Sequence, residues 1–130
     1  MKSVRVLLVD DEEGFSSVLA KRLSRRAVDV STSLCGEDAL HRLETDDYQV
    51  VVLDMKMPGM NGLEVLRIIK TRHPHVEVIF LTGNTDMKSA LASMTAGAFD
   101  FMLKPANTEI LMNRIVDAAR QGRIGRDKAV

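Results

Sequence analysis

Five short runs of β-branched and aliphatic residues recur along the chain, and they constrain the fold more than any other feature. They span residues 4–9, 28–33, 50–53, 76–81 and 99–103. The first and third runs contain Val6-Leu7-Leu8-Val9 and Val50-Val51-Val52-Leu53, with no alternation of apolar and polar residues. A strand that is apolar on both sides is covered on both sides, as in a parallel sheet. The runs therefore predict a parallel sheet packed between two layers.

Segments with helical periodicity lie between these runs and after the last one. Apolar residues recur in them every three to four positions, as in residues 63–69 and 110–118. Pro74 should end the third helix, Gly97 suits the end of the fourth, and Asn107 can cap the fifth. The strand–helix unit thus repeats five times. This order predicts an α/β fold, a three-layer, doubly wound (βα)5 sandwich around a five-stranded parallel sheet.

The fourth helical segment carries an apolar stripe at positions i, i+3, i+4 and i+7. The stripe consists of Met87, Ala90, Leu91 and Met94. A helix on the surface of a globular protein turns such a stripe toward the core, so we expect these residues to line the core. The polar residues Lys88, Ser89 and Ser93 should then lie nearer to a partner.

The length and composition predict a single domain whose positive and negative charges balance. We expect residues 1–121 to form the folded unit and residues 122–130 to be a flexible tail or the start of a linker. The 18 Lys and Arg residues balance 18 Asp and Glu residues, so no global field favours nucleic acid or membrane. No apolar run reaches the roughly 18 residues of a membrane-spanning helix, and no secretory signal is recognisable. Cys35 is the single cysteine, which suits a cytoplasmic location.

Polar residues follow the predicted strands at one edge of the sheet. Asp10-Asp11 ends the first strand and Asp54 the third, while Thr82 and Lys104 follow the fourth and fifth. The common order for five such strands is 2-1-3-4-5, which places a ligand crevice between strands 1 and 3. Five polar side chains should therefore converge there.

This combination of side chains predicts phosphoryl-transfer chemistry. Three neighbouring carboxylates repel one another unless a cation lies among them, and a small set of hard oxygen ligands suits Mg²⁺. A carboxylate can act as the nucleophile, while Thr82 can donate a hydrogen bond and Lys104 can neutralise an incoming anion.

Two enzyme classes offer alternatives. A nucleotide-binding enzyme would need a glycine-rich phosphate loop, and the chain contains neither G-x-G-x-x-G nor G-x-x-x-x-G-K-[ST]. An aspartate-nucleophile phosphatase shares the chemistry but places its nucleophile after the first strand, and turnover of a substrate would reveal it.

Taken in order, the motifs resemble those of CheY-like receiver domains, the response-regulator modules of two-component signal transduction. The motifs are Asp10-Asp11, Asp54, the segment 57–62, Thr82-Gly83 and the segment 101–105. The likeness extends over residues 4–121 and implies a flavodoxin-like sheet of order 2-1-3-4-5.

The resemblance also implies roles for the residues around the phosphoacceptor, Asp54. Asp11 and Asp54 would bind Mg²⁺ directly, Asp10 would bind it largely through water, and Lys56 would contribute its backbone carbonyl. The side chain of Lys56 and that of Asn84 would tune the loss of the phosphoryl group.

A second set of implied roles concerns the response to phosphorylation. Thr82 and Lys104 would contact the phosphoryl group, and Phe101 would change its side-chain rotamer. The Lys104–Pro105 peptide bond would be cis. The face formed by the fourth helix, fifth strand and fifth helix would then change shape.

The implied partners are those of a signalling module rather than of an enzyme with a turning-over substrate. A sensor histidine kinase or a phosphotransfer protein would donate the phosphoryl group. An output domain or protein would read the change, activation could drive homodimerisation, and nucleic acid would be contacted only through an output domain. The alternative within this family is a receiver-like interaction module that works without phosphorylation, and Mg²⁺ binding would distinguish the two.

Overall fold

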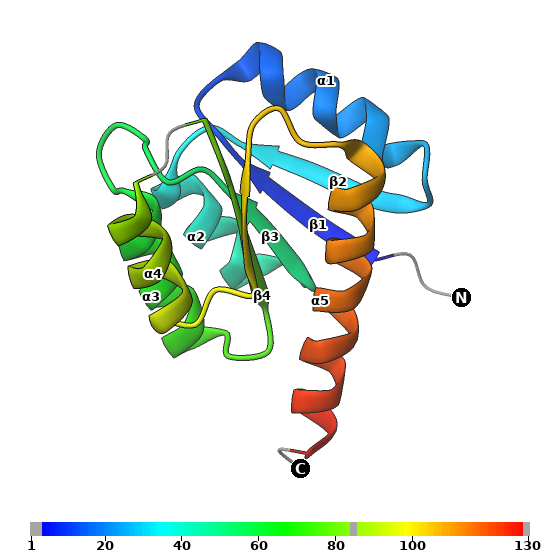
Figure 1. Cartoon of the computed structure of the whole chain (residues 1–130). Coiled ribbons are helices and arrows are strands. Elements are labelled where there is room, and N and C mark those ends of the chain that lie inside the picture. Colours follow the sequence, from blue (N-terminus) through cyan, green and yellow to red (C-terminus); the bar gives the residue numbers. More distant parts are fainter. Residues whose placement is uncertain (1–3, 84–85, 129–130) are drawn as a thin grey trace.

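Five strands and five helices alternate along the chain in a computed structural model that describes residues 4–83 and 86–128, with side chains described as far as Gly125. The elements are β1 Val4–Val9, α1 Glu13–Ser24, β2 Val28–Ser33, α2 Gly36–Thr45, β3 Val50–Leu53, α3 Gly62–Arg72, β4 Glu77–Thr82, α4 Met87–Thr95, β5 Asp100–Leu103 and α5 Thr108–Lys128. All strand pairs are parallel, in the order β2-β1-β3-β4-β5 (Figure 1). The predicted fold class and strand order are confirmed.

The sheet separates two apolar cores. On one side, Leu19 and Leu23 of α1 and Leu111 and Ile115 of α5 pack against the sheet. On the other, α2, α3 and α4 cover it, as Figure 1 shows, and the buried residues there include Ile69 of α3. The central strand β3 is fully buried along its length because it faces both cores. This explains why its sequence shows no polar alternation.

Helix boundaries follow the signals in the sequence. Helix α3 ends before Pro74, and Gly97 follows α4 with a φ of 107°, the left-handed conformation that glycine adopts easily. The Oδ1 of Asn107 accepts hydrogen bonds from the backbone N–H groups of Glu109 (2.9 Å) and Ile110 (3.2 Å). These three predictions are confirmed.

The predicted orientation of α4 is wrong. Met87, Leu91 and Met94 are 76%, 61% and 46% exposed, so the apolar stripe faces outward. Ser93, which we expected nearer to a partner, is fully buried, and its hydroxyl donates to the carbonyl of Ser89 at 2.8 Å.

The small size of the Ser93 side chain, rather than hydrophobicity, explains which side of α4 packs against the rest of the domain. The internal hydrogen bond of Ser93 satisfies its hydroxyl, so burial leaves no unpaired polar group. A short side chain there lets the helix lie close to its neighbours. The periodicity identified a helix correctly but could not decide which of its faces the sheet covers.

Helix α5 extends further than expected. It continues to Lys128, whereas we expected a flexible tail or linker from residue 122. Gly122 is buried, and a Cβ atom added there would collide with the backbone carbonyl of His75. The segment is therefore helical as far as Lys128, and its role as a tail or as the start of a linker stays a prediction.

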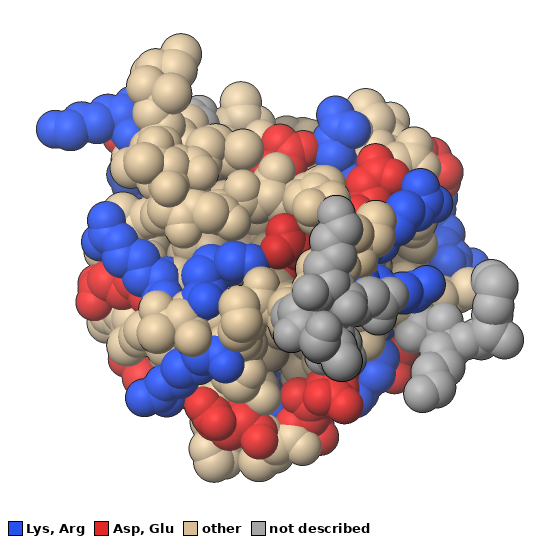
Figure 2. Space-filling view, turned by 90° about the horizontal axis from the view of Figure 1, so that it is seen from below, with Lys and Arg blue, Asp and Glu red and all other residues tan. Residues whose placement is uncertain are grey.

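None of the described helices combines the length and apolar character needed to cross a membrane. Positive and negative side chains are interspersed on the face that Figure 2 presents, in keeping with the balanced composition.

Gly62 brings the start of α3 against the backbone beneath Asp54. Its N–H donates to the carbonyl of Met55 at 2.9 Å. A Cβ atom at this position would lie 2.6 Å from the carbonyl oxygen of Asp54 and 2.8 Å from the ring of Phe80. Only glycine allows this close approach, so the residue helps to fix the loop that follows β3.

We expect Gly62→Ala to lower the free energy of unfolding by about 1–3 kcal/mol, the usual cost of overpacking a tight site. Gly14→Ala is the matched control, because nothing lies within 4 Å of a Cβ there. In helix α1 the control should stabilise the protein by about 0.5–1 kcal/mol. Urea unfolding at constant m-value measures both changes. A Gly62→Ala variant as stable as the parent would contradict the close approach.

Candidate functional site

Two buried carboxylates lie side by side at the carboxyl edge of the sheet. Asp10 follows β1 and Asp54 follows β3, and the register of these strands pairs Val9 with Leu53 immediately before them. The N–H of Asp54 donates to the carbonyl of Val9 at 3.0 Å. Both acids are almost fully buried, with exposures of 1% for Asp10 and 5% for Asp54. The sheet topology therefore forces two like charges into a place with little water.

Lys104 places its ammonium group among these acids. Its Nζ lies 2.7 Å from Oδ2 of Asp10, 2.8 Å from Oε1 of Glu12 and 3.5 Å from Oδ2 of Asp54. The same atom lies 4.4 Å from the centre of the Phe15 ring, within the range of a cation–π contact. A single cation thus bridges the loop after β1 and the end of β3.

Burial and hydrogen bonding shift the pKa values of Asp10 and Lys104 in opposite directions. Burial raises the pKa of Asp10, although the hydrogen bonds from Lys104 and from the N–H of Glu12 partly offset it. Burial alone would lower the pKa of Lys104, but its hydrogen bonds to Asp10 and Glu12 outweigh this and raise the pKa. Lys104 therefore stays protonated in the resting site.

The charges and donors of the cluster fit a divalent cation. Oxygen atoms of Asp10, Glu12 and Asp54 all lie within 4.8 Å of one another. Among the described residues, the cluster contains three carboxylates and one ammonium group that contacts them. Its formal charge is therefore two units negative. Carboxylate oxygens without nitrogen or sulfur ligands are the donor set that Mg²⁺ prefers.

The structure brings together Asp10, Asp54 and Glu12, whereas the sequence predicted Asp10, Asp54 and Asp11. Asp11 is exposed in the turn after Asp10, while Glu12 joins the cluster in its place. Sequence reasoning missed Glu12 because it lies beyond the strand end. The signal that could have found it is the unbroken run of acids from residue 10 to residue 13 opposite Lys104. Lys56 is exposed, and Asn84 lies outside the described residues.

The remaining predicted residues border the same edge. Thr82 ends β4 and is 1% exposed. Phe101 on β5 is half-buried, with its ring centre 5.9 Å from that of Phe80 at an interplanar angle of 38°. The Lys104–Pro105 peptide bond is cis, the isomer that the resemblance implied.

Comparisons with known proteins agree with this geometry. The family model of the response regulator receiver domain matches residues 6–116. The DNA-binding transcriptional regulator NtrC of Klebsiella pneumoniae is 37% identical over 98 residues, which are 75% of this chain and 21% of NtrC. The transcriptional regulatory protein TcrA of Mycobacterium tuberculosis is 32% identical over 126 residues, which are 97% of this chain and 50% of TcrA. A solved receiver-domain protein from Clostridium thermocellum is similar with a TM-score of 0.87 at 32% identity, covering 93% of this chain and 98% of that one.

The parallel sheet, with paired acids and a lysine at its carboxyl edge, places this chain in the class of receiver domains. The chain belongs to the response-regulator receiver family of two-component signal transduction. It spans between a fifth and a half of the length of the two curated relatives described above.

We expect Asp10→Asn to stabilise the fold near neutral pH in the absence of divalent cations. Because the folded-state pKa of Asp10 is raised above its ordinary value of 3.8, its ionised form destabilises the folded state above that value. An amide of the same shape removes this penalty, and its oxygen can still accept from Lys104. The gain should shrink as the pH falls toward 3.8, where Asp10 becomes protonated in both states.

Urea unfolding of both proteins across this pH range measures the effect. Asp47→Asn is the control, because Asp47 is exposed and lies outside the acidic cluster. A gain that does not depend on pH, or a loss of stability at neutral pH, would contradict the account of Asp10.

Proposed function

We propose that Asp54 accepts a phosphoryl group from a phosphohistidine of a sensor histidine kinase or a phosphotransfer protein. The observation that carries this proposal is the buried carboxylate of Asp54 beside Asp10, with the ammonium group of Lys104 3.5 Å away. Burial removes water that would compete for the phosphoryl group. The nearby cation offers an anion site next to the nucleophile.

The proposed step is an in-line displacement at phosphorus. A carboxylate oxygen of Asp54 forms the new O–P bond while the P–N bond to the partner's imidazole breaks, and the nitrogen leaves with the bonding pair. Mg²⁺ bound among the acids would neutralise charge on the transferred phosphoryl group. The product is an acyl phosphate, which water later hydrolyses.

Lys104 changes partners in this proposal. In the resting site its Nζ is hydrogen-bonded to Asp10 and Glu12. A phosphoryl group on Asp54 adds about 1.5–2 negative charges and three acceptor oxygens, which compete with the carboxylate of Glu12 for Lys104. The hydroxyl of Thr82, at the end of the neighbouring strand β4, would donate to a phosphoryl oxygen.

The signal would leave through the face formed by α4, β5 and α5. Movement of Thr82 would let Phe101 move inward, which shifts the population between two packings of this face. The outward stripe of Met87, Leu91 and Met94 lies on α4, and Leu103 on β5 is 53% exposed. An output domain, an output protein or a second receiver would therefore meet an apolar surface there.

The proposed setting is the cytoplasm, where kinases of this kind present their phosphohistidine. The domain would catalyse its own modification without turning over a separate substrate, so it would be a signalling module and not an enzyme. Contact with nucleic acid would occur only through an output domain.

Incubation with acetyl phosphate and Mg²⁺ tests the phosphoacceptor. Intact-protein mass spectrometry should show the gain of one phosphoryl group in the parent and none in Asp54→Asn, which keeps the shape but removes the nucleophile. Asp47→Asn should behave like the parent. No gain in the parent would favour the phosphorylation-independent interaction module, and an equal gain in Asp54→Asn would exclude Asp54 as the acceptor.

Thermal unfolding with increasing Mg²⁺ tests which acids hold the cation. The ion should raise the melting temperature, because a ligand that binds only the folded state stabilises it. We propose that Asp11, the ligand that the family resemblance implies, binds the ion in preference to Glu12, so Asp11→Asn should weaken apparent Mg²⁺ affinity roughly tenfold through the loss of one ligand charge. Glu12→Gln should weaken it less, since Lys104 already engages that carboxylate at 2.8 Å. The reverse order would assign the ligand to Glu12.

A further inference from the structure

Strand β2 is the edge of the sheet on the side opposite β5, and its outer backbone is open. It pairs with β1 alone among the described strands. The carbonyl of Ser33 accepts from the N–H of Asp10 at 3.0 Å, so the backbone groups of Ser33 point toward β1. Because successive residues of a strand point their N–H and C=O groups to opposite sides, those of Val30 and Thr32 point away from the sheet.

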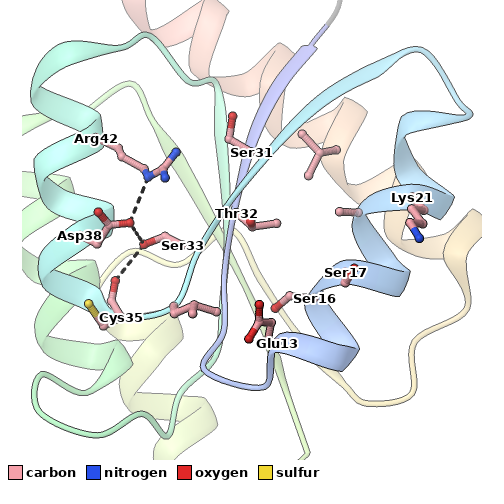
Figure 3. A pocket seen from close by; sticks show the side chains of 13 residues that line it. Glu13, Ser16, Ser17, Lys21, Ser31, Thr32, Ser33, Cys35, Asp38 and Arg42 are labelled. Carbon is pink, nitrogen blue, oxygen red and sulfur yellow. Dashed lines mark hydrogen bonds and ion pairs between the residues drawn. The ribbon is translucent and has the colours of Figure 1, made fainter.

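A groove runs along this open edge. Figure 3 shows α1 on one side of β2 and α2 on the other, with polar side chains directed into the space between them. The groove has a volume of about 800 Å³. Its lining includes Ser16, Ser17 and Lys21 of α1, Thr32 of β2, and Asp38 and Arg42 of α2.

The edge lacks the features that usually prevent strand addition. Natural edge strands are protected by long charged side chains, proline or a bulge. In β2 only Asp29 is charged, and it pairs with Arg5 on the neighbouring strand at 3.5 Å. All six residues of β2 keep continuous register with β1, without a bulge. Short side chains such as Ser31 and Thr32 leave the backbone accessible from the groove.

Shape and polarity favour a single extended strand as the occupant. Pockets for small molecules are lined mostly by hydrophobic and aromatic residues, whereas most residues that line this groove carry a hydroxyl or charged group. A two-fold dimer requires a surface that is complementary to itself, and two concave grooves do not fit into each other. A single strand can enter between the helices and use the open N–H and C=O groups of Val30 and Thr32.

Two charged residues on α1 set the charge pattern of such a strand once it pairs antiparallel, the slightly more stable arrangement. Glu13 and Lys21 line the groove, and neither forms an ion pair with another described residue. They are eight positions apart on the helix, which is about 12 Å, or roughly four residues of an extended strand. Helix α1 begins at the carboxyl edge of the sheet, so Glu13 lies toward the end of β2 and Lys21 toward its start.

We propose that this groove binds an extended segment of another protein that pairs antiparallel with β2. The segment carries a basic residue facing Glu13 and an acidic residue four positions later facing Lys21. Positions between them that face α2 carry small polar side chains, matching the hydroxyl of Ser31 and the Asp38–Arg42 pair.

The capped peptide Lys-Thr-Val-Thr-Glu is the probe, added to the ¹⁵N-labelled full chain and followed by NMR and amide hydrogen exchange. Saturable shifts should centre on β2, and the outward amides of Val30 and Thr32 should exchange at least tenfold more slowly. The reversed peptide, Glu-Thr-Val-Thr-Lys, should bind roughly fivefold more weakly, because it opposes like charges at two exposed sites.

Ser17→Arg fills the groove from α1 and should abolish these shifts. Ser24→Arg adds the same side chain to the same helix outside the groove and should leave them unchanged. No saturable shift at millimolar peptide, equal loss in both variants, or shifts centred on α4 would overturn the proposal. Shifts of β2 that grow with protein concentration in the absence of peptide would also overturn it, because they would make a second copy the occupant.

Discussion

The resting site depends on the ammonium group of Lys104, which lies between the buried carboxylates of Asp10 and Asp54. Placing two acids side by side away from water is unfavourable, and a single lysine that follows β5 compensates for much of it. Loss of this lysine would leave two buried acids without their shared cation, and removing the compensating partner of a buried charge commonly costs about 3–5 kcal/mol. We propose that the negative charge that remains unbalanced attracts a divalent cation, and that the cation in turn neutralises a phosphoryl group on Asp54.

The parallel sheet explains why these residues meet although they are far apart in the chain. Every strand of such a sheet delivers the residue after it to the same edge, so Asp10, Asp54 and Lys104 converge without any local sequence contact. Gly62 adds to this by bringing α3 against the backbone of Asp54. The fold places these side chains at one edge of the sheet, and their charges determine what that edge can bind.

The sequence predicted the features that follow from local patterns. The unbroken apolar runs of β1 and β3 indicated a parallel sheet, and the acids after them indicated the site. The rest depends on contacts that no local pattern reveals. Glu12 joins the cluster through a lysine 92 positions away. Helix α4 turns its methionines outward because Ser93 packs inward, and Gly122 of α5 packs against the backbone of His75.

We propose that Lys104 moves from Glu12 to the phosphoryl group when Asp54 is phosphorylated. A crystal structure of the protein with Mg²⁺ and beryllofluoride, which mimics a phosphoryl group on an aspartate, would test this most directly. We predict that Nζ of Lys104 contacts the fluoride shell on Asp54 and is no longer within hydrogen-bonding distance of Glu12, which it now approaches to 2.8 Å. An adduct in which Lys104 keeps its bonds to Asp10 and Glu12 and leaves the fluoride atoms uncontacted would contradict the account.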